Sequence, residues 1–263
     1  MLDTYCPRCV SGEDNSAAIQ SAIDEAHANG GGTVALPSGV WPLSGSLILA
    51  DHVTLRGAGL TATTLTMLPG QALPFIVVDS PNGRGTGEGW AIESLGFDGE
   101  AGGAGATASH AVLVTGGSSY AILRRLRIRN VSAHAIVFGT GLVNYVFLEE
   151  LFLEDTGLGA ITLAPDQSSS GIFLSDIVIR DFGKRAADRS CAAIRLHARC
   201  HISQLHIEPV ATGHTGLHFG SGSGKTVVSG MYIGLSGGQA RSVAPDVEGI
   251  CISTEAIRRL QPA

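Results

Sequence analysis

The feature that most constrains this chain is a short aliphatic pattern that returns at steps of 25, 26, 28 and 26 residues between Leu126 and Met231. Each copy carries aliphatic side chains at its first, fourth and sixth positions. The step from the fourth to the sixth position is the alternation of a β-strand, whereas the three-residue step before it predicts a bend at the same place in every copy. Five copies align without gaps, and an earlier one is divergent: Leu123–Asn130, Leu148–Asp155, Leu174–Asp181, Ile202–Pro209 and Val228–Leu235, with Ile92–Gly99 before them.

A second short strand follows each copy, so that every repeat holds three strands. A unit of about 25 residues cannot bury its apolar side chains alone and must stack on its neighbours. Parallel crossover connections are right-handed in about 98% of cases. The pattern therefore predicts an all-β fold, a right-handed parallel β-helix with three strands per rung. The expected second strands are His110–Thr115, His134–Gly139, Gly159–Ala164, Ala192–His197, Thr215–Gly220 and Glu248–Ser253.

A solenoid needs its ends covered, and residues 14–29 have the pattern of a capping helix. Apolar side chains recur at helical spacing, Asp14 or Asn15 is suited to the N-cap, and Gly30–Gly32 would end the helix. We expect one domain over residues 1–263. Its parts are an N-terminal tail (1–13), the capping helix (14–29), the rungs (33–253) and a C-terminal tail or short helix (254–263).

Composition and charge exclude several classes of protein. The 36 glycines and the low charged fraction of 15% are typical of a chain with many strands and turns. A net charge of −6 argues against a nucleic-acid partner. No apolar run is long enough to span a membrane, and the N-terminus lacks the pattern of a signal peptide.

An arginine cluster at residues 124–129 is the one candidate basic patch. Stacking the rungs places Arg129, Glu154, Arg180 and Glu208 in one outward column of alternating sign. Neighbouring strands lie about 4.8 Å apart, so each charge would face opposite charges on either side. We interpret the cluster as an ion-pair ladder on a sheet face, with polyanion binding as the alternative.

The cysteines give little support for a metal site. Cys6 and Cys9 form a single C-P-R-C motif without a second pair at zinc-site spacing, which favours a flexible tail or a local disulfide. We expect no metal ligands and no cofactor, since calcium, although compatible, has no motif here.

Residues Asp14–Gly59 resemble the start of the pectate-lyase superfamily β-helix domain. The resemblance lies in the order of a helix, a glycine stop, a T-V-x-L-P-x-G strand and a V-T-L-R-G-A-G strand. The superfamily includes polygalacturonases, rhamnogalacturonases, uronan epimerases and phage tailspikes. The resemblance implies a polysaccharide substrate or receptor glycan as partner, an extracellular or virion-associated location, and a monomer or homotrimer. The fold serves many activities and does not choose among them.

The catalytic motifs of the polygalacturonases are incomplete in this chain. Gly213–Gly216 resembles a broken G-H-G motif and would place His214 in the site. Asp188–Ile194 is similar to D-D-C-I-A-I with one aspartate missing, and would place Asp188 there. Neither an R-I-K motif nor the D-P-H-E motif of alginate epimerases is present. A standard polygalacturonase site is therefore not expected.

One polar, basic spot stands out on the outward side of the second strands. The residues following the buried aliphatic column are Leu113, Val137, Thr162, Arg195, His218 and Cys251, and His197 lies two residues beyond Arg195. Two long loops, Asp181–Ser190 and Ser236–Val247, would bracket the rung that carries His218. Long loops on a rigid scaffold commonly build sites, and these would bring Lys184, Arg185 and Arg241 close.

This combination of side chains suits uronic-acid chemistry. An arginine can bind a uronate carboxylate through two hydrogen bonds, and a histidine can take or pass a C5 proton. We predict catalytic roles for Arg195, His197, His218, Asp188 and His214. Substrate binding is predicted for Lys184, Arg185, Thr162 and Arg241. The alternative is that Arg195, His197 and His218 are surface residues of an exposed sheet without a function. We interpret His110 and His134 as turn residues.

The sequence thus predicts a polysaccharide-active protein that acts on an acidic, uronic-acid-containing glycan by lyase, epimerase or glycoside hydrolase chemistry. The alternative is a glycan-binding module of the phage tailspike type or a non-catalytic structural homologue. Aromatic residues make up only 5% of the chain, which argues against a long groove with aromatic platforms. The outward candidates Phe152 and Tyr232 lie on a different sheet from the histidines.

Overall fold

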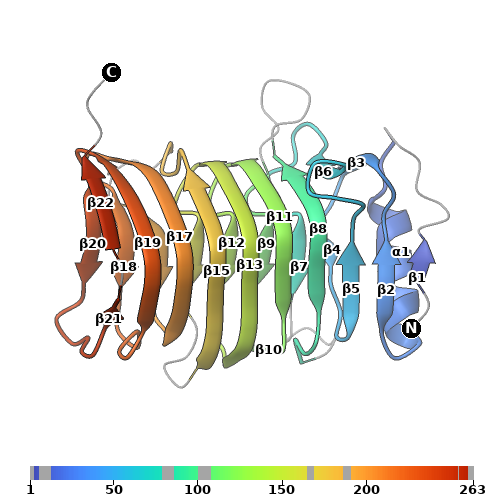
Figure 1. The fold of residues 1–263 in the computed structure, drawn as a ribbon. Helices are drawn as coiled ribbons and strands as arrows, with labels where there is room; N and C mark the ends of the chain where they lie inside the picture. Colours follow the sequence, from blue (N-terminus) through green and yellow to red (C-terminus); the bar gives the residue numbers. More distant parts are fainter. Residues whose placement is uncertain are drawn as a thin grey trace.

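The computed structural model describes residues 3–5, 13–78, 86–99, 108–164, 169–185, 191–253 and 255–259. Within them the chain winds into a right-handed parallel β-helix whose rungs stack side by side from the N-terminal helix to the C-terminus (Figure 1). All of the ladders between its named strands are parallel, and they join the strands into two sheets. The predicted fold class is confirmed.

The larger sheet, sheet A, has 14 strands among the described residues. Its central strands are long because each covers the two sides of the bend. The strands are β1 (Asp3–Tyr5), β2 (Gly32–Ala35), β3 (Gly39–Leu43), β5 (Val53–Arg56), β6 (Thr63–Met67), β8 (Ala91–Asp98), β10 (Ser118–Ser119), β11 (Ile122–Val131), β13 (Val143–Thr156), β15 (Ser170–Arg180), β17 (Cys200–Ala211), β19 (Val227–Ser236), β21 (Cys251–Ile252) and β22 (Glu255–Arg259).

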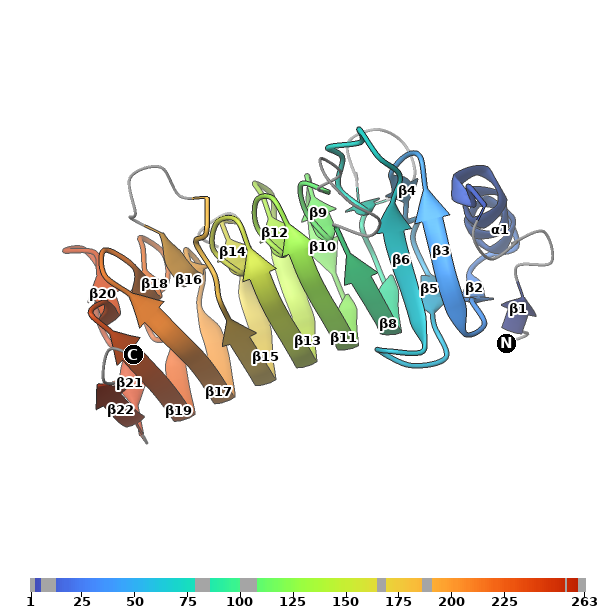
Figure 2. The same ribbon diagram turned by 90° about the horizontal axis from the view of Figure 1, so that it is seen from above.

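The smaller sheet, sheet B, has eight short strands, which lie behind those of sheet A along the solenoid (Figure 2). They are the second strands of the repeats. The strands are β4 (Leu47–Ile48), β7 (Ile76–Val78), β9 (Val112–Val114), β12 (Ile136–Phe138), β14 (Ile161–Leu163), β16 (Ala192–Leu196), β18 (Thr215–Phe219) and β20 (Gln239–Val243).

The predicted bend is a column of residues in the left-handed backbone region. Leu126, Leu151, Ile177, Leu205 and Met231 stand in register on neighbouring strands, as the repeat predicts. The residue immediately before each of them has φ between 52° and 67°, and Ser94 before Leu95 has the same conformation. A positive φ reverses the side-chain alternation, so the strand turns a corner and keeps its aliphatic side chains inside on both sides. The residues of this column are Ser94, Arg125, Glu150, Asp176, Gln204 and Gly230.

The N-terminal end is closed by α1 (Ser16–Ala28), which begins after Asn15 as N-cap. The helix buries Ile19 and Ile23 together with Ala22 and Ala26 against the first rung. The Asp14 carboxylate ties its start to the turn after β3. It accepts a 2.6 Å hydrogen bond from the Ser44 hydroxyl, which lowers the pKa of Asp14 to about 2.

Both chain ends differ from the expected tails. Residues Asp3–Tyr5 form β1, which pairs with β2, inside the segment expected to be an N-terminal tail. Residues Glu255–Arg259 form β22, which pairs with β19, where a tail or short helix was expected. Edge strands carry unpaired backbone N–H and C=O groups. The terminal segments form strands because they pair with these groups of β2 and β19.

The last rung also differs from the prediction. The expected second strand Glu248–Ser253 does not join sheet B; its Cys251–Ile252 form β21 beside β19. The strand that pairs with β18 is β20, which sets Arg241 opposite Leu217 and Ser242 opposite His218. This strand lies at the open end of the solenoid and carries no buried aliphatic residue. The aliphatic pattern therefore could not reveal it.

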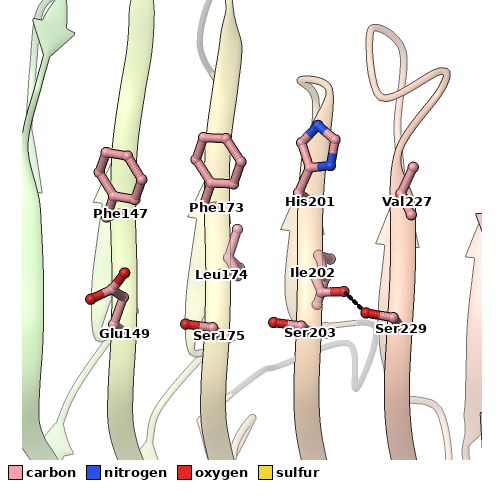
Figure 3. Close-up of a pocket in the computed structure, with 10 residues that line it drawn as sticks. All are labelled: Phe147, Glu149, Phe173, Leu174, Ser175, His201, Ile202, Ser203, Val227 and Ser229. Carbon is pink, nitrogen blue, oxygen red and sulfur yellow. Dashed lines mark hydrogen bonds between the residues drawn. The ribbon is translucent and has the colours of Figure 1, made fainter.

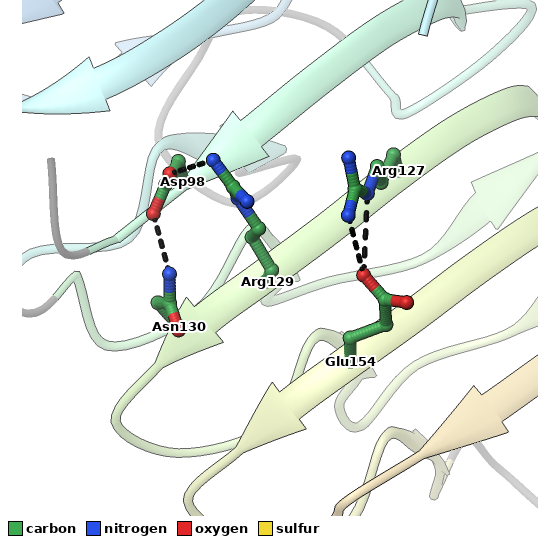
Figure 4. A network of polar contacts seen from close by, with 5 residues as sticks. All are labelled: Asp98, Arg127, Arg129, Asn130 and Glu154. Atoms are coloured by element: carbon green, nitrogen blue, oxygen red, sulfur yellow. Dashed lines mark hydrogen bonds and ion pairs between the residues drawn. The ribbon is translucent and has the colours of Figure 1, made fainter. Parts of the chain in front are cut away.

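The outward charges of sheet A lie in the predicted register. Arg129, Glu154, Arg180 and Glu208 are successive neighbours, and the ladder starts one rung earlier at Asp98. The ion pairs are diagonal as well as direct. Arg129 binds Asp98 at 2.6 Å, whereas Glu154 binds Arg127 at 2.9 Å (Figure 4). The ion-pair interpretation of the arginine cluster is confirmed for these pairs. No helix of the described residues is long and apolar enough to cross a membrane.

The left-handed conformation of the bend column should limit which residues the protein tolerates there without loss of folding stability. Asp176 has φ 55° and an exposed side chain. Asp tolerates this left-handed conformation because its short polar side chain can hydrogen-bond locally, whereas it costs a β-branched residue about 1–2 kcal/mol. We expect Asp176→Ile to lower the free energy of unfolding by about 1–2 kcal/mol in urea titrations. The control Asp176→Gly removes the same carboxylate but tolerates the conformation. Equal losses in the two variants would contradict the role of the bend.

Candidate functional site

From β7 to β18, the short strands of sheet B each present an outward residue between two buried ones. In β16, Ile194 and Leu196 are fully buried and Arg195 between them is exposed. In β18, Leu217 and Phe219 are buried and His218 points outward. The sheet register places Arg195 between Thr162 of β14 and His218 of β18. Strand alternation together with rung stacking therefore brings these three side chains to one surface.

His197 lies on the same surface just beyond the end of β16. Its imidazole ring covers Gly220 of the next rung, where a Cβ would clash with it. The ring centroids of His197 and His218 are 6.0 Å apart. On the other side, the His218 Nδ1 atom lies 2.8 Å from the Ser242 hydroxyl.

A further histidine joins from the preceding rungs. The His134 Nδ1 atom lies 3.0 Å from the Gly159 carbonyl oxygen and 3.3 Å from the Thr162 hydroxyl. The His110 ring stacks on His134 with 6.2 Å between centroids. Both histidines precede their strands, as the sequence interpretation had them, but that interpretation did not place His134 beside Thr162. Their equal spacing from the buried aliphatic residue of each strand was the available signal. We call His134, Thr162, Arg195, His197 and His218 the Arg195 cluster.

The histidines of the Arg195 cluster favour the neutral form. Burial lowers the pKa of His218, and the charges of Arg195 and His197 lower it further. Burial also lowers the pKa of His197, and Arg195 adds to the effect while a hydrogen bond to the Ser221 backbone opposes it. The pKa of His134 is lowered by burial and by Arg195, against a hydrogen bond to the Gly159 backbone. Neutral imidazoles can accept protons at neutral pH.

The guanidinium of Arg195 is exposed and, among the described residues, forms no ion pair. It lies beside uncharged imidazoles rather than carboxylates. Arginine binds carboxylates through paired, charge-assisted hydrogen bonds. The surface is therefore suited to a ligand with a carboxylate. Arg195 can bind that carboxylate while a neutral histidine beside it accepts a proton.

Two of the predicted basic residues lie at another place. Lys184 pairs with Asp155 at the corner between sheets A and B. Lys184 and Arg185 line a pocket of about 300 Å³ there with Asn130 and Asp155. No member of the Arg195 cluster lines that pocket, so the structure does not bring these two predicted residues to the histidines.

His214 and Arg241 do not stand in the outward column of Arg195 and His218. His214 is buried, with its ring 5.5 Å from that of Phe182 and packed under Gly183. Arg241 lines the open C-terminal end with Phe219 and Ile250. Arg241 is the neighbour of Leu217 in register. The sequence pattern placed Cys251 next to His218 in the outward column, but Ser242 occupies that position. Asp188 lies outside the described residues.

Metal-binding side chains are not clustered in the described parts of the chain, where no group of three or more His, Cys, Asp or Glu could hold an ion. Cys200 is fully buried, which raises the pKa of its thiol, and Cys191 is buried as well. Cys6 and Cys9 lie outside the described residues.

Comparison with known proteins identifies the family. Residues 11–190 match the model of the family described as rhamnogalacturonase A/epimerase, pectate lyase-like, which covers more than half of the chain. The chain belongs to this family. Among curated relatives of this pectate lyase-like protein is the mannuronan C5-epimerase AlgE6 of Azotobacter vinelandii, 42% identical over 94 residues. The match covers 33% of this chain but only 11% of the epimerase.

Solved structures show the same fold at low sequence identity. The adhesin PfbA of Streptococcus pneumoniae superposes with a TM-score of 0.67 and 15% identity, over 98% of this chain and 72% of the adhesin. The tailspike of E. coli bacteriophage HK620, a mutant solved with a pentasaccharide, gives a TM-score of 0.65 and 17% identity. That match covers 97% of this chain and 48% of the tailspike. At these identities the likeness concerns the fold.

The electrostatics of the Arg195 cluster can be tested by titration. We expect Arg195→Gln to raise the pKa of His134, His197 and His218 in NMR titrations, because each is lowered partly by the Arg195 charge. His110 is the internal control. Its pKa is lowered to about 4 by burial and by His134, without a direct effect of Arg195, so it should shift less than the other three. An unchanged pKa at both His197 and His218 would contradict the proposed cluster.

Proposed function

We propose that this protein acts on an acidic, uronic-acid-containing glycan by removing the C5 proton, as a lyase or an epimerase. The observation that carries this proposal is the exposed Arg195 guanidinium among neutral histidines on adjacent rungs. Membership of a family described by rhamnogalacturonase A and epimerases, and partial identity to a mannuronan C5-epimerase, support a glycan as substrate.

The chemistry assigns a role to each side chain. Arg195 binds the uronate carboxylate and stabilises the negative charge that develops as the C5–H bond breaks. His218, held by Ser242 and neutral because its pKa is lowered, accepts that proton. Thr162, next to Arg195 in register, contributes a hydroxyl to sugar binding.

Two outcomes follow from loss of the C5 proton. In β-elimination, the C5–H electron pair forms the C4–C5 double bond, the C4–O bond breaks, and the leaving oxygen receives a proton. In epimerisation, a proton returns to C5 from the opposite face of the ring. In β-elimination, the imidazolium that His218 becomes on taking the C5 proton can pass that proton to the leaving oxygen. In epimerisation, water on the opposite face of the ring supplies the proton.

Glycoside hydrolysis has less support from this surface. The usual mechanism needs a pair of carboxyl groups flanking the scissile bond. Among the described residues, the strands of sheet B carry no Asp or Glu. A hydrolase would have to draw on residues such as Asp188, outside the described part.

A glycan-binding module without catalysis is the second candidate. Its support is the incomplete set of hydrolase motifs, together with the likeness of fold to a tailspike solved with a pentasaccharide and to an adhesin. Under this proposal the protein is extracellular or virion-associated and forms a homotrimer. Sedimentation of the purified protein as a monomer would count against the tailspike form.

Activity assays separate the two candidates. We expect turnover of polymannuronate or polygalacturonate, measured as ultraviolet absorbance of unsaturated product or as C5 deuterium exchange by NMR. Arg195→Ala and His218→Ala should each lower the rate at least about 100-fold, the usual scale of general acid–base catalysis. The exposed Arg199 nearby provides the control Arg199→Ala, which should retain activity. Unchanged rates in both test variants would refute the site, and binding without turnover by the unaltered protein would favour the binding module.

A further inference from the structure

A second surface with ligand-binding character lies on the outer face of sheet A. Phe147, Phe173 and His201 occupy one column on neighbouring strands, with Val227 next in register. Two residues further along each strand, a polar column of Glu149, Ser175, Ser203 and Ser229 runs parallel to it. Together these columns line a pocket of about 270 Å³ (Figure 3). We call this surface the sheet A platform.

The rings of the platform form a continuous strip. The centroids of Phe147 and Phe173 are 5.0 Å apart with planes 7° from parallel, and those of Phe173 and His201 are 5.2 Å apart at 18°. Figure 3 shows the three rings side by side, with their faces visible in front of the strands. Both phenylalanines are only half-buried. Because the rings stack on one another, the strip presents to a ligand their exposed edges and the uncovered parts of their faces.

Most side chains of the polar column are available to form hydrogen bonds with a ligand. In the described part of the chain, the side chains of Glu149, Ser175 and Ser203 make no hydrogen bond or ion pair. Arg124 is the neighbour of Glu149 in register, but its guanidinium binds Glu93 at 2.8 Å. The Ser229 hydroxyl makes one long bond, donating to the Ile202 carbonyl oxygen at 3.4 Å.

This pairing of an exposed aromatic strip with a line of hydroxyls and a carboxylate matches the two sides of a sugar ring. The C–H face of a pyranose packs on an aromatic ring, while its hydroxyls need hydrogen-bond partners at the edge. The charge of Glu149 selects among sugars. A carboxylate accepts strong hydrogen bonds from hydroxyls but repels a uronate.

We propose that the sheet A platform is a second glycan-binding site, specific for a neutral saccharide segment and separate from the Arg195 cluster. The inference rests on the proposed function only in that the ligand is a glycan. The two sites have opposite charge preferences: Arg195 attracts uronates, whereas Glu149 disfavours them. One glycan with acidic and neutral stretches could thus be held on two faces of the solenoid.

Calorimetric titration with cellohexaose, maltohexaose and mannohexaose tests the proposal, with hexamannuronate as the acidic comparison. We expect at least one neutral hexasaccharide to bind, and Phe173→Leu to weaken that binding at least about tenfold by removing the flat ring while keeping an apolar side chain. Phe152→Ala is the matched control, because Phe152 is an exposed phenylalanine of the same sheet outside the pocket. That variant should bind as the unaltered protein does.

Two further readouts sharpen the test. Glu149→Gln should weaken neutral-sugar binding and reduce the discrimination against hexamannuronate. Phe173→Leu should leave turnover of acidic glycan unchanged, so failure of this inference is distinguishable from failure of the proposed catalytic site. The inference is overturned if no neutral hexasaccharide binds, or if Phe173→Leu and Phe152→Ala have equal effects. Matching urea midpoints for the two variants establish that folding is intact.

Discussion

The structure depends on the stacking of inward aliphatic side chains from one rung onto the next. A single rung cannot enclose its own apolar surface, so the burial of Leu126, Leu151 and Ile177 requires neighbours in exact parallel register. A one-residue slip would expose the whole column. The left-handed residue before each of these aliphatics keeps the column inside while the strand turns a corner.

The same register that builds the core also builds the outer surfaces. Because inward residues align, outward residues align too. Side chains of similar type therefore form columns in which successive residues lie about 4.8 Å apart. Sheet A thereby gains an ion-pair ladder and an aromatic strip, and sheet B gains the Arg195 cluster. The histidines of the cluster remain neutral because burial disfavours their charged form and Arg195 adds to this effect. A repetitive scaffold can therefore bring an arginine and several histidines to one surface through register alone.

Much of this arrangement could be predicted from residue spacing. The rungs from Ile92 to Met231 and the alignment of Arg195 with His218 follow from the aliphatic repeat, since a fixed register leaves little freedom. The terminal strands could not be predicted in this way. β20 and β22 form because an edge of the sheet has free backbone groups, which no side-chain pattern records. Lys184 lines a separate pocket, and Arg241 lies on the strand beside His218 but in the column of Leu217. Loop length alone gives neither the path of a loop nor the face on which a side chain lies.

By itself, the sequence determined the solenoid, its capping helix and the columns of its regular rungs, because burial of a periodic aliphatic pattern admits few other solutions. Only the tertiary structure decided which columns form candidate sites. His134 lies next to Thr162 and Arg195 because a side chain reaches across rungs. Phe147, Phe173 and His201, far apart in the chain, form one strip because three long strands lie in register. Side-chain reach and packing between rungs, rather than spacing along the chain, set both candidate sites.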